Sequence, residues 1–115
     1  MKNRSKQQKS RYLQNLVKDR IIKLYPALTN KDIRTSNTGE NGADVRLLSH
    51  QARKLFPYSI ECKNRSDMKM IYAFYKQAKK HNRLEPLLVI KTLRKKPLAI
   101  IDLEHLFELQ EDTAH

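Results

Sequence analysis

The sequence is poor in cysteine, glycine, tryptophan and long apolar runs, and these shortages exclude several classes of protein. A single cysteine, Cys62, excludes a framework of internal disulfides and predicts a reducing, cytoplasmic compartment. Apolar runs such as Leu87–Ile90 fall far short of the roughly 20 residues that a membrane-spanning helix needs. The basic, polar start of the chain lacks the apolar segment of a cleavable signal. We therefore expect no membrane-spanning segment and no cleavable signal, and a membrane is not the partner that we expect.

Acidic residues are also scarce over most of the chain. The whole sequence has a formal net charge of +12, but residues 1–101 alone hold 24 basic and seven acidic side chains, a net charge of +17. So high a charge density repels itself in a compact fold, and a polyanionic partner explains it best. DNA or another nucleic acid is the simplest such partner, and a membrane surface is the weaker alternative.

The length of 115 residues allows one core and excludes two domains of usual size. We expect a basic N-terminal arm at residues 1–11, followed by a single domain at residues 12–115. Lys9 and Arg11 in this arm are candidate phosphate contacts, although a solubilising tail or the solvated start of a helix explains the same composition.

Apolar spacing predicts an α/β order of elements along the domain. A helix is expected to end before Pro26, and Asp67 and Asp102 have the residue type that caps a helix start. The expected elements are a helix at 10–25, a short strand at 33–35, strands at 43–48 and 59–63 joined by a connector at 53–57, a helix at 67–82, hairpin strands at 86–92 and 98–102, and a final helix.

Two further expectations concern packing and backbone shape. Gly39 and Gly42 are the only glycines and lie three residues apart, which indicates unusual backbone angles or a close approach at that place. Tyr72, Phe74 and Tyr75 lie on or beside the apolar stripe of the second long helix, so core packing is favoured over stacking on bases.

One group of side chains has the composition of a metal site. Alternation along a strand places Glu61 and Lys63 on one face and turns Cys62 towards the core. If the strand that begins near Asp44 pairs with this one, two carboxylates converge beside an ammonium group. Two hard oxygen ligands and a backbone carbonyl make an incomplete cage of the kind that Mg²⁺ prefers, because Mg²⁺ keeps several waters and takes further oxygens from substrate phosphate.

The pattern Asn41-Gly42-Ala43-Asp44, followed by Glu61-Cys62-Lys63, resembles the PD-(D/E)XK nuclease superfamily. The resemblance implies a restriction-endonuclease-like α/β fold, with a central mixed sheet of about five strands flanked by helices. It also implies that Asp44, Glu61 and the carbonyl of Cys62 bind Mg²⁺, for which Mn²⁺ substitutes, and that Lys63 positions or activates the attacking water. Ala43 stands where the superfamily often has proline, a position that contributes no ligand.

Within the superfamily, the small basic chain and Ser36 upstream of the aspartate look most like archaeal-type and phage Holliday junction resolvases. Those enzymes use a further glutamate near the first helix, whereas this helix offers only Gln14 and Asp19. The nearest substitute for that ligand is Glu40. The resemblance further implies a phosphate or water contact at Ser36 and polar contacts from the following helix, for which Gln77 and Lys80 are the candidates. A solvated helix face explains these two residues equally well.

Three functions remain open at this point. The first is a structure-selective, metal-dependent DNA endonuclease, for which a homodimer is expected because junction substrates have two-fold symmetry. The leucine-rich end at 103–109 either packs on the sheet or forms the dimer contact. The second is a sequence-specific or nicking endonuclease of the same fold. The third is a non-catalytic nucleic-acid-binding protein in which Asp44, Glu61 and Lys63 form an ordinary ion-paired surface. The basic turn at 93–97 is either a grip on the DNA backbone or a soluble turn.

Overall fold

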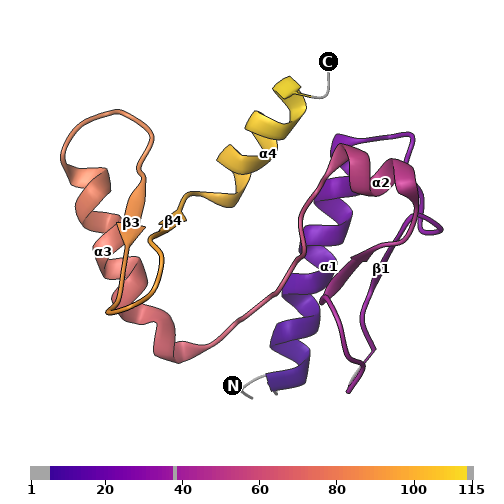
Figure 1. Ribbon diagram of the computed structural model, residues 1–115, viewed down its shortest axis with the longest axis horizontal. Coiled ribbons are helices and arrows are strands. Elements are labelled where there is room, and N and C mark those ends of the chain that lie inside the picture. The colour runs from indigo at the N-terminus through magenta and orange to yellow at the C-terminus, as the bar shows by residue number, and fades with distance from the viewer. Residues whose placement is uncertain (1–5, 38, 114–115) are drawn as a thin grey trace, which may run out of the picture. The chain divides into compact units, whose positions relative to one another are not determined.

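A computed structural model of the chain describes residues 6–37 and 39–113. These residues have a mixed α/β structure of four α-helices and two antiparallel sheets of two strands each (Figure 1). They divide into two compact units: the first takes in the residues up to Arg65 together with the stretch from Gln110, and the second is Ser66–Leu109. Among the described residues, no helix is long and apolar enough to cross a membrane.

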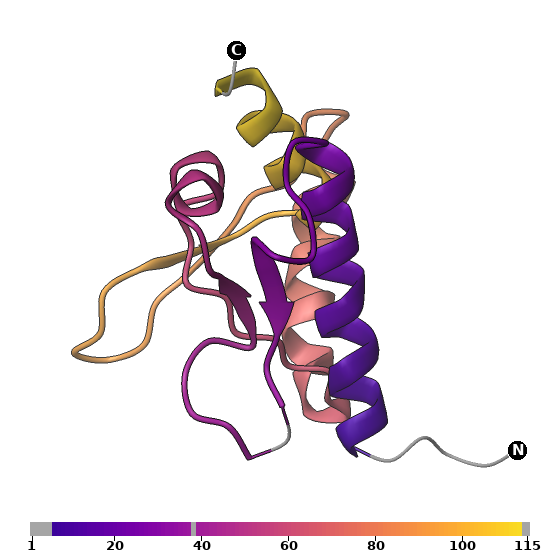
Figure 2. The ribbon, with the colours of Figure 1, turned by 90° about the vertical axis from the view of Figure 1, so that its right-hand side faces the viewer.

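The first unit consists of a long helix packed against a small sheet. Its elements are α1 (Lys6–Leu24), β1 (Ile33–Thr35), β2 (Val45–Leu47) and α2 (His50–Leu55). Helix α1 contacts both strands, and Figure 2 shows it lying along them. Strands β1 and β2 pair antiparallel, with Ile33 opposite Leu47 and Thr35 opposite Val45. The buried side chains of this unit are Val17, Ile21, Tyr25, Leu28, Ile33, Val45, Leu47, Ala52, Phe56 and Cys62.

Helix α1 begins four residues earlier than its apolar spacing predicts. The basic residues from Lys6 to Arg11 are helical, and residues 1–5 of the predicted arm lie outside the described residues. Lysine and glutamine are good helix formers, so a polar segment extends the helix without help from the core. At the other end, Tyr25 is buried, and its hydroxyl donates to the carbonyl of Leu55 at 3.0 Å. The end of α1 is thereby joined to the end of α2.

Two expectations for residues 49–63 need correction. Part of the predicted connector is helix α2. Ser49 is the N-cap of this helix, and its side chain accepts a hydrogen bond from the backbone N–H of Ala52, which is buried in the core. The predicted strand at 59–63 is reduced to one isolated antiparallel bridge between Val45 and Ile60. The chain from 61 to 65 runs without regular secondary structure.

The second unit consists of a 3-10 turn, a helix and a β-hairpin, followed by the start of the last helix. The turn η1 (Ser66–Met68) leads into α3 (Lys69–Lys80), strands β3 (Leu88–Ile90) and β4 (Leu98–Ile100) pair antiparallel, and α4 (Leu103–Thr113) closes the chain. The hairpin is confirmed. The Asp67 cap is wrong, because the N-cap position of α3 is Met68, whereas Asp102 accepts hydrogen bonds from the N–H groups of Glu104 and His105 as expected.

The α/β class is confirmed, but the described residues do not form one central sheet of about five strands. They form the pairs β1–β2 and β3–β4, each in its own unit. Core packing was also wrong for two aromatic residues of α3, because Tyr72 and Phe74 are exposed while Tyr75 is half-buried. Cys62 is buried as expected, with 6% of its surface exposed.

Candidate metal and phosphate site

Asp44 lies at the start of β2, where three segments of the first unit meet. Its backbone N–H donates to the carbonyl of Ile60 at 2.8 Å, and its carbonyl accepts from the N–H of Ser36 at 2.8 Å. The backbone of Asp44 is therefore fixed on both sides, by the end of β1 and by the chain that leads to Glu61. The predicted pairing of these two segments is present here, over a single bridge rather than a full strand.

The side chain of Asp44 contacts the second half of the motif directly. Its Oδ2 accepts a hydrogen bond of 2.6 Å from the backbone N–H of Cys62. Its Oδ1 has no partner among the described residues, nor has the carbonyl oxygen of Cys62. One carboxylate oxygen thus positions the side chain, and the other is open to a cation.

Glu61 and Lys63 are both solvent-accessible, as the predicted alternation around buried Cys62 requires. Lys63 Nζ lies 3.4 Å from Glu61 Oε1, and the two side chains are 55% and 61% exposed. An ion pair so exposed contributes little to stability, because water screens it and both side chains lose freedom on pairing. Its charges are therefore free to turn to a phosphate or a metal ion at little energetic cost.

The pKa of the Cys62 thiol is affected by the negative charges of both carboxylates. Burial raises its pKa to about 11, and the negative charges of Asp44 and Glu61 add to the rise. Both carboxylates therefore lie near enough to Cys62 to act on its thiol. A thiol held in this neutral form is a poor ligand for zinc and other soft metals, since the thiolate is the species that binds them.

The donor set suits a hard divalent cation that brings most of its own ligands. Within residues 6–37 and 39–113, no three His, Cys, Asp or Glu side chains come together as a ready-made metal cage. Asp44, Glu61 and the Cys62 carbonyl supply only oxygen, and an oxygen set this small fits Mg²⁺, which retains waters and binds substrate phosphate. The residues present fit the predicted ion on this chemistry.

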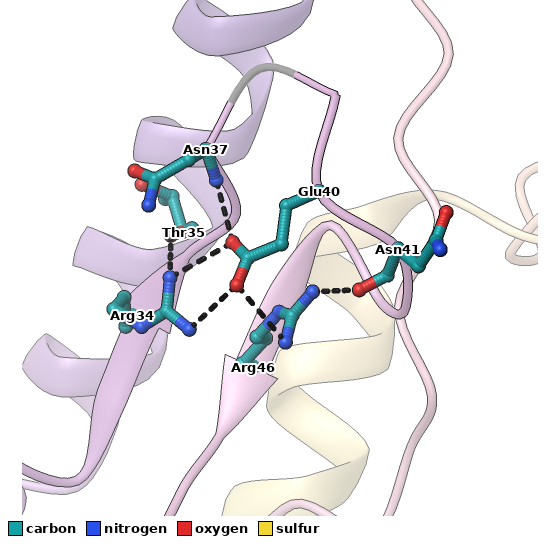
Figure 3. A network of polar contacts seen from close by, with 6 residues as sticks. All are labelled: Arg34, Thr35, Asn37, Glu40, Asn41 and Arg46. Carbon is teal, nitrogen blue, oxygen red and sulfur yellow. Dashed lines mark hydrogen bonds and ion pairs between the residues drawn. The ribbon is translucent and has the colours of Figure 1, made fainter.

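Glu40 takes part in a different arrangement, the arginine clasp shown in Figure 3. Its carboxylate receives two hydrogen bonds from the guanidinium of Arg34, at 3.0 and 3.1 Å, and lies 3.3 Å from Arg46 Nη1. The N–H of Asn37 donates to the same carboxylate at 2.8 Å, and Arg46 also donates to the carbonyl of Asn41. As a metal ligand, Glu40 would have to give up these partners.

The strand register explains why a carboxylate is needed at this place. Arg34 and Arg46 lie directly opposite each other on β1 and β2, and like charges in that position destabilise a sheet. Glu40 stands between them and neutralises the repulsion. Gly42 also serves the clasp: its φ is +107°, and a Cβ there would lie 3.0 Å from Arg46 Nη2. Gly39 has φ +78°, so the expectation of unusual backbone angles is confirmed at both glycines.

We expect the clasp to make stability depend on pH in a defined acidic window. Hydrogen bonds from Arg34 and from the Asn37 N–H lower the pKa of Glu40 from 4.5 to about 2. A depressed pKa means that this contribution is complete above pH 4.5 and is lost as the pH falls towards 2. The variant Glu40→Gln should melt several degrees lower at neutral pH and lose less stability across that window, as measured by thermal unfolding followed by circular dichroism. Equal acid sensitivity of the variant and the wild type would contradict the clasp.

Three of the predicted phosphate contacts lie in the first unit with the motif. Ser36 adjoins Asp44 through its N–H. The carbonyl of Lys9 accepts a hydrogen bond of 3.1 Å from the side chain of Asn64, which directly follows Lys63, so this turn of α1 lies beside the end of the motif. Arg11 is exposed on the same helix. Gln77 and Lys80 are exposed on α3 of the second unit, and their part in the site stays a prediction.

Two arginines near the motif were not among the predicted site residues. Arg46 and Arg53 line a hollow of about 510 Å³ that is also bordered by Ala43 and Ser59, each close in sequence to one half of the motif. Arg53 is held there by a hydrogen bond of 2.8 Å from its Nε to the carbonyl of Leu47. The alternation of buried and exposed positions along β2 could have indicated Arg46. Arg53 could not be found in this way, because it lies on helix α2, which was not predicted.

Comparison of the chain with family models, with curated proteins and with solved structures gave no match. The resemblance to the nuclease superfamily therefore rests on the residues of the motif alone.

Proposed function

We propose that this protein is a metal-dependent, structure-selective DNA endonuclease, most similar to Holliday junction resolvases of the PD-(D/E)XK superfamily. The observation that carries the proposal is the hydrogen bond from the Cys62 N–H to Asp44 Oδ2, because it joins the aspartate to the Glu-X-Lys segment across sixteen intervening residues. That junction lies in a chain whose first 101 residues have a net charge of +17. A metal site would explain why Asp44 is bonded to the segment that carries Glu61 in a chain that attracts DNA.

Each residue of the motif has a role in this proposal. Asp44, Glu61 and the Cys62 carbonyl would hold Mg²⁺, or Mn²⁺ in its place. When bound, such an ion polarises a phosphoryl oxygen and lowers the pKa of a bound water. Lys63, next to Glu61, would orient the attacking water or neutralise charge that develops on the phosphate. Arg46, Arg53, Lys9 and Arg11 would hold phosphates of the backbone, which positions DNA without reading its sequence.

The proposal also includes a more detailed fold, an oligomeric state and a cellular location. We propose a restriction-endonuclease-like core with a central mixed sheet of about five strands, as the resemblance implies, whereas the described residues supply two separate antiparallel pairs, β1–β2 and β3–β4. A homodimer would present two sites to a two-fold symmetric junction. A cytoplasmic location suits a DNA substrate and a single unpaired thiol.

Incubation with a panel of end-labelled DNAs tests the proposed activity. Four-way junction, flap, single-stranded and linear duplex DNAs should each be incubated with Mg²⁺, with Mn²⁺ and with EDTA. We expect cleavage of branched DNA with either metal and none with EDTA, read as discrete products on a denaturing gel. Cleavage confined to linear duplex at fixed sequences would instead favour the sequence-specific or nicking endonuclease of the same fold.

A non-catalytic nucleic-acid-binding protein is the second candidate, and one observation favours it. The exposed pair between Lys63 and Glu61 has the geometry of an ordinary surface ion pair. Calorimetric titration with Mn²⁺ separates the two, because the endonuclease should give a saturable site that is lost in Asp44→Asn. A purely binding protein should give no such site in either form.

A further inference from the structure

The tip of the β3–β4 hairpin carries positive charge that no other part of the second unit balances. The hairpin segment from 87 to 101 contains Lys91, Arg94, Lys95 and Lys96 and no acidic residue. All four side chains are exposed, and none of them forms an ion pair with an acidic residue in the part of the chain that the structure describes. Four cations within six residues repel one another, so the turn gains nothing in stability from them.

The backbone of this tip is strained at a charged residue. The N–H of Lys95 donates to the carbonyl of Thr92 at 3.2 Å, which closes a β-turn with Leu93 and Arg94 at its centre. Arg94 has φ +62°, and it is the only described residue other than glycine with a positive φ. Glycine takes this backbone conformation without steric cost, whereas a residue with a Cβ is strained in it. Strain of this kind persists where the side chain serves a function.

Leu93 is the apolar counterpart of Arg94 at the apex. It is 80% exposed, the largest exposure among the large apolar side chains described. An isolated exposed leucine is unremarkable on many surfaces, but this one projects from a narrow turn and is followed by three cations. Proteins that bend or open DNA insert leucine and similar side chains between unstacked bases while nearby cations hold the phosphates.

A hollow of about 380 Å³ lies directly behind the apex. It is lined by the cross-strand pair Ile90 and Leu98 and by Lys91, Lys95 and Lys96, with Thr92. The apolar pair offers a surface for a sugar or the face of a base, and the three lysines that line the same hollow supply cations for a phosphate. The chemistry of the hollow therefore matches one nucleotide of a backbone that passes along the hairpin.

We propose that the β3–β4 tip is a second DNA-contacting element, in which Leu93 enters an unstacked base step and Arg94 with its neighbouring lysines holds the flanking phosphates. Open base steps occur at branch points and not in continuous duplex, so this element would supply the preference for branched DNA. The inference rests on the proposed function only in its DNA-binding part, and it does not require cleavage.

Binding measured in EDTA tests the element without interference from cleavage. Fluorescence anisotropy should be recorded for the wild type and for Arg94→Gly, Arg94→Lys and Leu93→Ala on a labelled four-way junction and a linear duplex of the same base composition, over a range of salt concentrations. Arg83→Gly and Leu84→Ala are the matched controls, since both positions are exposed and lie in the same unit outside the hairpin. Thermal unfolding of each variant reports on the fold.

Arg94→Gly separates function from structure, because glycine relieves the strained turn. We expect it to melt at or above the wild-type temperature and yet to bind both DNAs about tenfold more weakly, with a salt slope smaller by about one, while Arg94→Lys recovers most of the affinity. Leu93→Ala should weaken junction binding about fivefold and leave duplex binding unchanged. The reason is that an inserted leucine replaces lost stacking contacts only where a base step is open.

The other possible outcomes distinguish failure of the tip proposal from failure of the endonuclease proposal. Wild-type affinity in Arg94→Gly, or equal losses on junction and duplex in Leu93→Ala, would overturn the tip proposal while leaving the endonuclease proposal in place. Junction binding that depends on the tip, combined with no cleavage in Mg²⁺ or Mn²⁺, would support the tip and overturn the endonuclease. A wild-type protein that binds neither DNA would overturn both.

Discussion

Asp44→Asn is expected to reduce Mg²⁺-supported cleavage of branched DNA by at least ~10³-fold, which corresponds to a loss of roughly 4 kcal/mol of transition-state stabilisation. The amide oxygen of asparagine can still accept the hydrogen bond that Asp44 Oδ2 receives from the Cys62 N–H, so the local fold should persist. The charge that would hold the cation is lost. Glu61→Gln should give a loss of similar size. Initial rates on a four-way junction, at saturating enzyme and with either metal, measure both effects.

Binding of DNA provides the control for this prediction. Removal of a negative charge from a basic surface should leave binding in EDTA unchanged or make it stronger, because phosphate repulsion falls. Asp19→Asn on α1 is the matched variant, since it removes the same charge from an exposed position of the same unit and should cleave at the wild-type rate. Full cleavage by Asp44→Asn would rule out this metal site, and loss of cleavage in Asp19→Asn would show that overall charge, not position, is responsible.

Ile21→Ala is expected to lower the free energy of unfolding by about 2–5 kcal/mol, the range for truncating a fully buried isoleucine. Ile21 is completely buried on α1, the helix that contacts both strands of the first sheet. A small unit of this kind has few other apolar contacts with which to fill the cavity. Urea unfolding followed by circular dichroism should show a lower midpoint with an unchanged slope.

The next residue along the helix supplies the comparison. Ile22 is the same side chain at a half-buried position, so Ile22→Ala should cost much less than Ile21→Ala. Because Asp44 directly precedes β2, which α1 contacts, Ile21→Ala should also lose Mn²⁺ binding at urea concentrations where Ile22→Ala retains it. Equal destabilisation by both variants would show that α1 is not held by the face that buries Ile21.

Several features of the fold could be predicted from local patterns. The 3.6-residue spacing of Val17 and Ile21 marked α1, and the two apolar runs around a basic turn marked the β3–β4 hairpin. In each case the pattern and the turn chemistry agree over a continuous stretch. The Asp102 cap was predictable for the same reason, since its carboxylate bonds to N–H groups only two and three residues away.

The features that could not be predicted depend on contacts between distant residues. Helix α2 begins at His50 and has one buried residue, Ala52, so it has no apolar periodicity to detect. The strand predicted around Glu61 is reduced to a bridge because only Ile60 pairs with β2 among the described residues. The prediction that Asp67 caps α3 was wrong because the chain forms a 3-10 turn before that helix. Residue type alone does not distinguish such a turn from a first α-helical turn.

The candidate site also has one part that could be predicted from the sequence and one part that could not. Strand alternation placed Glu61 and Lys63 on the exposed side and Cys62 on the buried side, and the structure has them so. The surroundings of Glu40 were not predictable, because the two arginines that hold it meet only through the register of β1 and β2. A scarce acid in a basic chain indicated a special role, but the partners that define the role come from tertiary structure.

The three hydrogen bonds around Asp44 have an entropic consequence. Its N–H, its carbonyl and one carboxylate oxygen are each bound to backbone groups, from Ile60, Ser36 and Cys62. Ordering a residue from a mobile state costs conformational entropy of about 1–2 kcal/mol for the backbone alone. Here that cost is met during folding, before any cation arrives. In the proposed metal site, the carboxylate would therefore hold a largely hydrated ion that a flexible loop with the same residues would fail to retain.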